Sequence, residues 1–498
     1  MVRLNLRKIK FFPSRNNQKF QFLLSFAAGW FVFGQLWTQE ISKAFDVAGF
    51  PWFEPRPIQQ CVCQRFVDAC LPCGNIRLDM ETKMKNNLDI SKSYYRSYRY
   101  KPLSSVEDET HRWRFLTSRH NYEITNQEPR IGLNGMWKRE VDEVDKISKV
   151  FIRTHDSNTK KSTGPLSVTG MFRKSDPFHG FTYLVNLEEG GKADWRKHTT
   201  VEVWKSFVSG KPKLLDIELS TQTEMINIIS PLSKVTERFN LFLQRYEQNV
   251  LGPHGTKSGA VRMIFVIFEP PEGEKVKKDD SVVYTVQVLD QFKARNPNAL
   301  VEYIFTKGEF NRAIGIHTGV KQCKEDEIVL FLDVDLKIGP DFLNRVRRNT
   351  LMGKRVIFPI MYSQYDPDVM DESGRVVPSL QALTDNKLDI NKQTGFWIYY
   401  AYGVAAMYKV DYLKVGGFRL DIRGWGGEDV DLFKKMVADP DLDVMSMVDP
   451  DLIHIYHKRG CDVNLASDQY AMCIGAWAET LGSKMEVASL YLDGKSHK

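Results

Sequence analysis

From residue 224 onward, aliphatic segments alternate along the chain with segments whose apolar residues recur every three or four positions. Met225–Pro231 predicts a strand, and Ser233–Gln248 has the spacing of an amphipathic helix. The same alternation predicts strands at Val261–Phe268 and Leu300–Phe305 and helices at Val282–Phe292 and Phe310–Val320. This order predicts an α/β domain with a doubly wound, mostly parallel sheet, which we place at residues 219–498.

One expected strand of this domain ends in two acidic residues. Ile328–Leu332 has no polar break, so we expect a strand that is buried on both faces of the sheet. Asp333 and Asp335 follow directly, and open α/β sheets bind ligands at the carboxyl ends of their strands. Carboxylates there can hold a divalent cation that also takes phosphate oxygens. A surface turn is the alternative interpretation.

A second unusual stretch, GWGGEDVD, covers Gly424–Asp431. Gly426 and Gly427 allow backbone angles that other residues avoid and a close approach of a ligand. Trp425 can offer a flat face to a sugar ring, and Glu428 and Asp429 open an expected helix. Acids stabilise helix starts, which explains at least one of them. A carboxylate beside an aromatic ring also suits a general base that deprotonates a sugar hydroxyl.

The amino-terminal region contains an apolar run, Phe20–Trp37, that predicts a membrane-spanning signal anchor at residues 20–38. A cleaved signal peptide is the alternative, but no small-x-small cleavage site follows the run. The basic residues 1–19 lie before it, so we expect a cytosolic amino terminus and a lumenal remainder. The short span suits the thin membranes of the early secretory pathway, and we expect a single-pass type II protein of the Golgi membrane.

The net charge of +7 does not predict a nucleic-acid partner, because six basic and no acidic residues lie within residues 1–19. Residues 39–110 read as a stem without sustained periodicity. Its four cysteines, which lie within thirteen residues, can form disulfides or hold zinc, and an oxidising lumen favours disulfides in a pairing that stays open. They are Cys61, Cys63, Cys70 and Cys73. Residues 111–218 predict a small α+β lead-in region.

The domain at about residues 219–490 resembles the chondroitin N-acetylgalactosaminyltransferases, which are related to the β-1,4-galactosyltransferases and chondroitin synthases. The resemblance rests on DVD, GWGGED and the FNRA element at residues 310–313. Further matching segments are MINIISPLSKVTERFNLFLQRYE, GKRVIFPIMYSQYDP, TGFWIYYAYG, LIHIYHKRGCD and QYAMCI. The resemblance implies a GT-A-type glycosyltransferase domain, a UDP-sugar donor and a divalent metal, for which manganese is our expectation.

The resemblance also assigns roles to individual residues. Asp335 is the expected metal ligand, Asp429 the expected base, and Glu428 its neighbour that contacts a sugar. The residues expected to contact the nucleotide sugar or acceptor are Phe310, Arg312, Asp333, Val334, Trp425, Gly426 and Gly427. Packing in the core is the alternative for Phe310, and a surface ion pair is the alternative for Arg312.

A second metal ligand is expected from the segment that contains His454 and His457. On a continuous strand these two side chains would face opposite sides, so we expect only one of them to bind the metal. The related families place a metal-binding histidine before a charged turn, which favours His457. We also expect Cys461 and Cys473 to pair in an oxidising lumen.

The predicted function is that of an inverting glycosyltransferase in chondroitin sulfate synthesis. It would move N-acetylgalactosamine from UDP-N-acetylgalactosamine to an acceptor that ends in glucuronic acid. The chain has one DVD and one GWGGED, whereas chondroitin synthases carry two transferase domains. The alternatives are a β-1,4-galactosyltransferase and a non-catalytic membrane partner of a synthase. Whether the protein forms homo-oligomers or assembles with other chondroitin-synthesising enzymes stays open.

Overall fold

The computed structural model describes residues 112–483, except for 125–127, 158–163, 177–179, 190–196, 209, 221–223, 233–236, 253–260, 270–279, 340, 373–389, 425 and 459. All of them belong to one compact unit, Lys92–Lys498. None of the helices in this part of the chain is long and apolar enough to cross a membrane. The predicted tail, anchor and cysteine-bearing stem lie outside the described residues.

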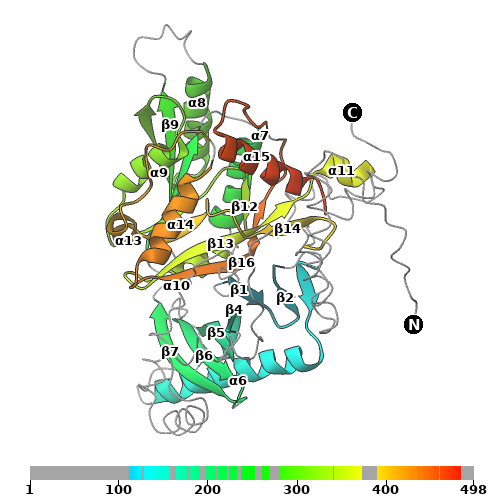
Figure 1. Cartoon of the computed structure of the whole chain (residues 1–498). Coiled ribbons are helices and arrows are strands. Elements are labelled where there is room, and N and C mark those ends of the chain that lie inside the picture. Colours follow the sequence, from blue (N-terminus) through cyan, green and yellow to red (C-terminus); the bar gives the residue numbers. More distant parts are fainter. Residues whose placement is uncertain are drawn as a thin grey trace, which may run out of the picture. The chain divides into compact units, whose positions relative to one another are not determined.

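Most of the elements are labelled in Figure 1. The first part of the chain contains β1 (Arg112–Leu116), β2 (His120–Tyr122), β3 (Arg130–Gly132), α6 (Gly135–Ser157), β4 (Leu166–Asp176), β5 (Gly180–Glu189), β6 (Lys197–Ser206) and β7 (Pro212–Ser220). The rest contains β8 (Ile226–Leu232), α7 (Glu237–Tyr246), the π-helical turn Glu247–Leu251, β9 (Val261–Glu269), α8 (Asp280–Arg295), β10 (Leu300–Lys307), α9 (Arg312–Lys321), β11 (Ile328–Phe331), β12 (Leu336–Ile338), α10 (Phe342–Asn349), β13 (Arg355–Gln364), α11 (Pro367–Glu372), β14 (Gly395–Ile398), β15 (Ala405–Tyr408), α13 (Lys409–Lys414), α14 (Glu428–Ala438), β16 (Asp443–His454) and α15 (Ser467–Thr480).

The strands form one mixed sheet in the order β10-β9-β8-β11-β15-β13-β16-β1-β4-β5-β6-β7. Neighbours from β10 to β11 are parallel, and so are β13 and β16. β15 runs antiparallel to both β11 and β13. The predicted mostly parallel sheet is therefore confirmed for the second half of the chain, where β15 and the short strands β12 and β14 pair antiparallel with their neighbours.

Helices cover both faces of this part of the sheet, as the alternating sequence predicts. Ile328 and Leu330 of β11 belong to the core cluster that contains α7 and α8. Val329 and Phe331 belong to the cluster that contains α9 and α14. Because successive residues of a strand point to opposite faces, β11 is buried on both sides, which explains why it has no polar residue.

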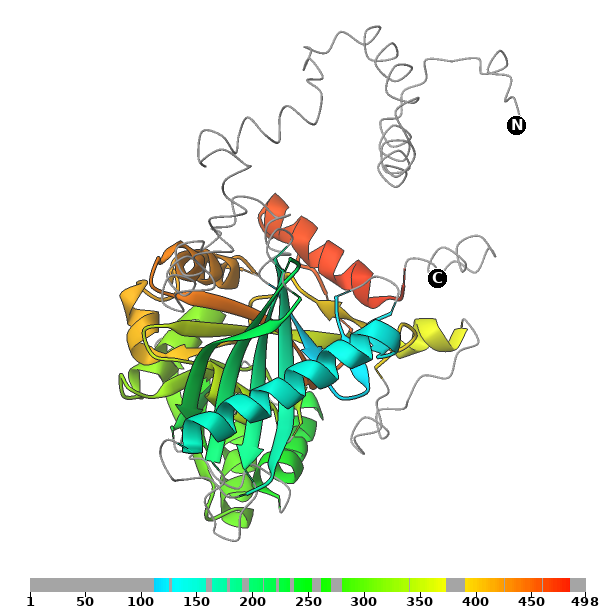
Figure 2. The same ribbon diagram turned by 90° about the horizontal axis from the view of Figure 1, so that it is seen from below.

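The amino-terminal strands continue the sheet and do not form a separate layer. β1 pairs in parallel with β16 and antiparallel with β4, after which β4 to β7 follow as an antiparallel meander. α6 lies across this meander in Figure 2, and its Val141, Val144 and Ile152 are buried against it. The pairing of β1 with β16 therefore joins these strands to the rest of the sheet without a break, and the domain limits at 110 and 218 stay a prediction.

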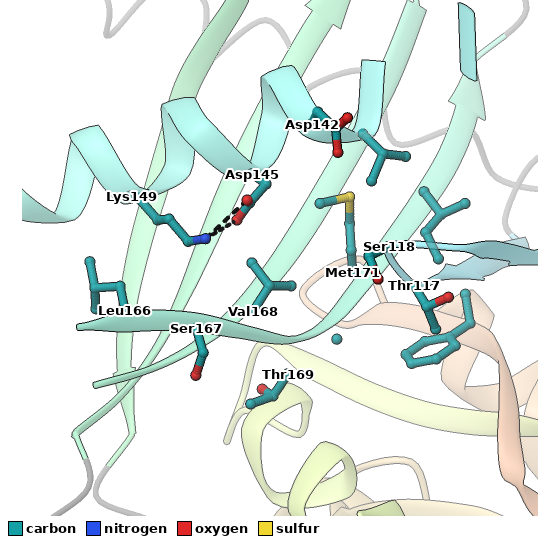
Figure 3. A pocket seen from close by; sticks show the side chains of 14 residues that line it. Thr117, Ser118, Asp142, Asp145, Lys149, Leu166, Ser167, Val168, Thr169 and Met171 are labelled. Atoms are coloured by element: carbon teal, nitrogen blue, oxygen red, sulfur yellow. Dashed lines mark hydrogen bonds and ion pairs between the residues drawn. The ribbon is translucent and has the colours of Figure 1, made fainter. Parts of the chain in front are cut away.

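A cavity of about 400 Å³ lies between α6 and β4. Figure 3 shows the side chains around it, including Asp145, whose carboxylate pairs with Lys149 at 2.8 Å. None of the candidate catalytic, substrate-binding or metal-binding residues predicted from the sequence lines this cavity. Candidate chemistry therefore has to be sought at the carboxyl ends of the parallel strands.

A buried charge cluster fixes β16 upstream of the histidines that it carries. Arg345 of α10 donates to both carboxylate oxygens of Asp449 and to Asp451, at 2.6–2.8 Å. Burial raises the pKa of Asp449 although Arg345 opposes this shift. A buried arginine with two carboxylates has its donors satisfied, so the cluster holds the end of β16 against α10.

Candidate active site

Asp333 and Asp335 lie where the sequence predicts, beyond the carboxyl end of β11. The strand ends at Phe331, and β12 begins at Leu336. β12 pairs antiparallel with the end of β16, with Leu336 opposite His454. The backbone N–H of Ile455 also donates to the carbonyl of Asp335 at 3.0 Å. This pairing brings the DVD motif and the histidine segment together although 119 positions separate Asp335 from His454.

Asp335, His454 and His457 form a compact group that can hold a metal ion. Their ligand atoms lie within 4.8 Å of one another. The Nε2 atom of His457 is 3.1 Å and that of His454 is 3.6 Å from Oδ2 of Asp335. The Nδ1 atom of His454 lies 3.1 Å from the hydroxyl of Ser363, and that of His457 lies 3.2 Å from the Lys458 carbonyl. Such bonds orient an imidazole so that its other nitrogen faces the ligand.

The expectation that His454 and His457 face opposite sides is wrong. β16 ends at His454, so His457 lies on irregular backbone to which the alternation of a strand does not apply. The chain turns after His454 and brings His457 back to Asp335. His457, which the sequence favours, is joined in the group by His454.

The electrostatics of the group suit a cation. Burial opposes ionisation of Asp335, yet hydrogen bonds from His454 and His457 hold its pKa well below the usual range. One carboxylate and two imidazoles match the ligand preferences of first-row divalent metals. The residues present therefore fit the divalent metal that the sequence predicts.

Arg312 connects the two acidic motifs. It is the first residue of α9, and its Nε donates to Asp333 at 3.0 and 3.2 Å. Its Nη2 donates to the Gly403 carbonyl at 2.8 Å, and its Nη1 lies 3.6 Å from Glu428. The guanidinium is therefore not a solvated surface group, and it joins DVD to the start of α14. A contact of Arg312 with a nucleotide stays a prediction.

α14 begins at Glu428, as the sequence predicts. Gly426 and Gly427 have φ angles of 76° and 95°, which side-chain-bearing residues rarely adopt, so the turn into the helix requires glycines. Glu428 is buried, and burial raises its pKa against the effect of Arg312. Asp429 is half-buried and accepts a hydrogen bond only from the N–H of Val430 among the described residues. Asp429 is thus the freer carboxylate of the pair, whereas Trp425 lies outside the described residues.

Phe310 and Val334 flank the same region. The Phe310 side chain is 48% exposed, and its ring packs on Phe268 with centroids 5.1 Å apart. Core packing alone therefore does not account for Phe310, since a large part of the ring is accessible to a ligand. Val334 is partly buried and lines a small cavity beside Asp335.

A disulfide between Cys461 and Cys473 confirms the predicted pairing. It links the segment that follows His457 to α15. Cys323 is left as a free, buried thiol, and burial raises its pKa to about 12. The bond thus restrains the chain just beyond the metal-binding group.

A comparison of the sequence with models of protein families gives a match over most of the chain. A model of the chondroitin N-acetylgalactosaminyltransferase family matches residues 75–487. The chain belongs to this family. The match includes DVD, FNRA, GWGGED and both histidines, so every residue of the group described above lies within the family region.

Individual relatives give the same result. Chondroitin sulfate synthase 3 of Mus musculus is 29% identical over 432 residues, which are 78% of this chain and 46% of that protein. Chondroitin sulfate N-acetylgalactosaminyltransferase 2 of Homo sapiens is 30% identical over 346 residues, 67% of this chain and 60% of that protein. This family member thus spans about half the length of the curated relatives that it matches. Among solved structures, GalNAc-T7 with UDP, GalNAc and Mn2+ is 11% identical with a TM-score of 0.32, covering 52% of this chain and 49% of that one.

Two features of the site are missing from the sequence-based predictions. The sequence favours His457 and leads us to expect only one of the two histidines at the metal, because the end of β16 cannot be located from the sequence. The role of Arg312 as a bridge depends on the tertiary position of α14, which lies more than a hundred residues away. The spacing of the two histidines was the only available signal for the first, and none was available for the second.

Proposed function

We propose that the protein is an inverting, divalent-metal-dependent glycosyltransferase that moves N-acetylgalactosamine from UDP-N-acetylgalactosamine to an acceptor ending in glucuronic acid. The observation that carries the proposal is the group Asp335, His454 and His457, joined through Asp333 and Arg312 to the carboxylates of α14. Membership of the chondroitin N-acetylgalactosaminyltransferase family supports the choice of sugar. We assign the domain to the GT-A type.

The donor's diphosphate needs a cation because two phosphate charges are concentrated there as the glycosidic bond breaks. A metal ion, which we expect to be manganese, would be held by Asp335, His454 and His457 and would supply Lewis-acid stabilisation of the departing UDP. Phe310 offers an exposed ring face, on which we place the nucleotide base. Asp333 stays fixed by Arg312 and lines the donor side of the site.

Asp429 is the proposed general base. Glu428 is buried and engaged with Arg312, whereas Asp429 is more accessible and has no ion pair with any described residue. A carboxylate in this position can accept the proton of an acceptor hydroxyl as that hydroxyl attacks the anomeric carbon. The attack comes from the face opposite to the departing UDP, which inverts the anomeric configuration.

The setting of the enzyme is also a proposal. The apolar run at residues 20–38 and the basic residues before it support a single-pass type II protein of the Golgi membrane with a lumenal catalytic domain. The Cys461–Cys473 disulfide is consistent with an oxidising lumen. Chondroitin-type glycosaminoglycan chains on proteoglycans are the proposed acceptors, and other chondroitin-synthesising enzymes are the proposed partners.

The test is a transfer assay with the full-length chain and manganese. UDP-N-acetylgalactosamine and UDP-galactose are offered separately, each with an oligosaccharide that ends in glucuronic acid or in N-acetylglucosamine. We expect transfer of N-acetylgalactosamine to glucuronic acid and its loss with a chelator. Transfer of galactose to N-acetylglucosamine would instead identify a β-1,4-galactosyltransferase. Folded protein that transfers neither sugar would be a non-catalytic partner.

A further inference from the structure

A second cavity lies directly beside the proposed metal centre. It has a volume of about 170 Å³, enough for several water molecules, and we call it the α7 cavity. It is lined by Arg238, Leu241, Arg245, Val334, Asp335, Ile455 and Tyr456. The three residues of α7 follow the spacing i, i+3 and i+7, which puts them on one helix face. Two arginines of α7 therefore share a cavity with Asp335.

Arg245 is unusual because it is buried without an acceptor. Its side chain is 4% exposed, and its Nε and Nη2 atoms have no hydrogen-bond partner in the part of the chain that the structure describes. An arginine stays protonated in a protein, so this position carries a desolvated charge. Burial lowers the pKa of Arg245, with no anion acting against that shift. An arrangement of this kind destabilises the fold unless an anion occupies the cavity.

The other buried arginines in the described part of the chain all have an acceptor. Arg345 and Arg355 pair with carboxylates, and Arg173 lies 3.7 Å from Glu140. Arg347 donates to the Glu224 carbonyl, and Arg348 donates to the hydroxyl of Thr169. Arg245 is thus the exception, so its isolation is a local property of the α7 cavity.

A second cation adds to the positive potential near the cavity. Lys337 of β12 is buried, and burial together with the charge of Arg245 lowers its pKa to about 8 although Asp451 opposes the shift. Asp451 already accepts from Arg345. Asp451, the carboxylate that opposes the shift of Lys337, is therefore engaged with another arginine, and Asp335 is the carboxylate that lines the α7 cavity itself.

The backbone around Arg245 is fixed in this position. α7 continues into the π-helical turn Glu247–Leu251, where Asn249 donates to the Ile338 carbonyl of β12 at 2.8 Å. π-helical turns within α-helices occur frequently at functional sites. The turn and this bond hold the end of α7 that carries Arg245 next to β12.

We propose that the α7 cavity binds a phosphate group of the donor's diphosphate, with Arg245 and Arg238 as its charged ligands. This inference rests on the proposed function. An arginine fork matches the oxygens of phosphate and of carboxylate, so the acceptor's glucuronate is the competing source of the anion. The position favours phosphate, because the cavity includes Asp335 of the metal-binding group and not Asp429, where the acceptor is placed. A metal and two arginines would then neutralise the departing UDP from two sides.

The test compares ligand affinities of the full-length chain and of Arg245→Met, with manganese present. UDP, uridine and glucuronic acid are titrated by calorimetry. We expect UDP to bind at least about tenfold more weakly to Arg245→Met, which is the loss of roughly one charged hydrogen-bonding partner. The affinity for uridine, which has no phosphate, should stay the same. Arg295→Met, which removes an exposed arginine of α8, is the matched control and should bind UDP normally.

Thermal unfolding separates a binding role from a structural one. Without ligand, Arg245→Met should unfold at a higher temperature than the unaltered chain because an unpaired buried charge is removed, while UDP should raise its unfolding temperature less. If Arg245→Met fails to fold, Arg238→Gln takes its place in the test. Arg238 lies at a more accessible position, and its replacement should also weaken UDP binding.

Three outcomes would overturn the assignment. Equal UDP affinity in both arginine variants, with a higher KM for the acceptor, would assign the cavity to the glucuronate carboxylate. Equal affinities with a lowered unfolding temperature would make Arg245 a structural residue. If the unaltered chain binds no UDP at all, the proposed function itself fails. If it binds UDP with an affinity that neither arginine substitution changes, only the phosphate site is refuted.

Discussion

Replacing Arg312 should lower the free energy of unfolding as well as disturb the site, because its positive charge lies between two carboxylates. Asp333 lies 3.0 Å from its Nε, and Glu428, with 11% of its side chain exposed, lies 3.6 Å from its Nη1. Arg312→Met would leave Glu428 buried without its counter-ion and close to Asp333 and Asp429. Breaking a buried ion pair by removing one partner costs about 3–5 kcal/mol. We expect about 3 kcal/mol, since the Asp333 side chain is 39% exposed and remains partly hydrated.

The assay is chemical unfolding followed by tryptophan fluorescence at neutral pH. The matched control is Arg419→Met. Arg419 forms an exposed ion pair with Asp421 at 2.7 Å, so its replacement should change the free energy of unfolding very little. Adding Glu428→Gln to Arg312→Met should recover part of the lost stability by removing the stranded charge. A loss below about 0.5 kcal/mol, typical of ordinary surface substitutions, would refute the role of Arg312 as a bridge.

Three further predictions concern the rest of the site. His454→Ala should weaken manganese binding at least about tenfold in a calorimetric titration. The control His317→Ala removes a partner of the Tyr412 hydroxyl and should leave manganese binding unchanged. Equal manganese affinities of the two variants would exclude His454 as a ligand. Cys461→Ser opens a disulfide that spans 12 positions and should cost about 3 kcal/mol in chemical unfolding, and an unchanged midpoint would contradict this. Cys323, whose pKa burial raises to about 12, should resist iodoacetamide at pH 8 until the protein unfolds, as mass spectrometry would reveal.

Much of the fold follows from the sequence because periodicity is a local signal. The strands expected at Val261–Phe268 and Leu300–Phe305 agree with β9 and β10 to within two residues. The helix expected at Ser233–Gln248 is described from Glu237 and changes to a π-helical turn at Glu247, a change that hydrophobic spacing does not encode. The reversed strand β15 and the continuation of the sheet through β1 depend on pairing between distant segments. Local patterns carry no information about such pairing.

The candidate site, like the fold, can be predicted only in part from the sequence. Asp333, Asp335 and Glu428 are found from the sequence because they directly follow a buried strand or open a helix. The joining of His454 to His457 depends on where β16 ends, and the isolation of Arg245 depends on what surrounds α7. Burial and partners arise from tertiary packing, so the chemistry of these two side chains becomes visible only in the fold.

The most direct test of the account is the rate of N-acetylgalactosamine transfer by Asp429→Asn, measured beside Asp431→Asn with the full-length chain and manganese. Asp431 follows two residues later on α14 and forms an ion pair with Lys435 at 2.7 Å, so it controls for changes in the helix. If Asp429 is the base, kcat should fall at least about a hundredfold in Asp429→Asn alone, with UDP affinity retained. Equal rates for Asp429→Asn and the unaltered chain would contradict the account.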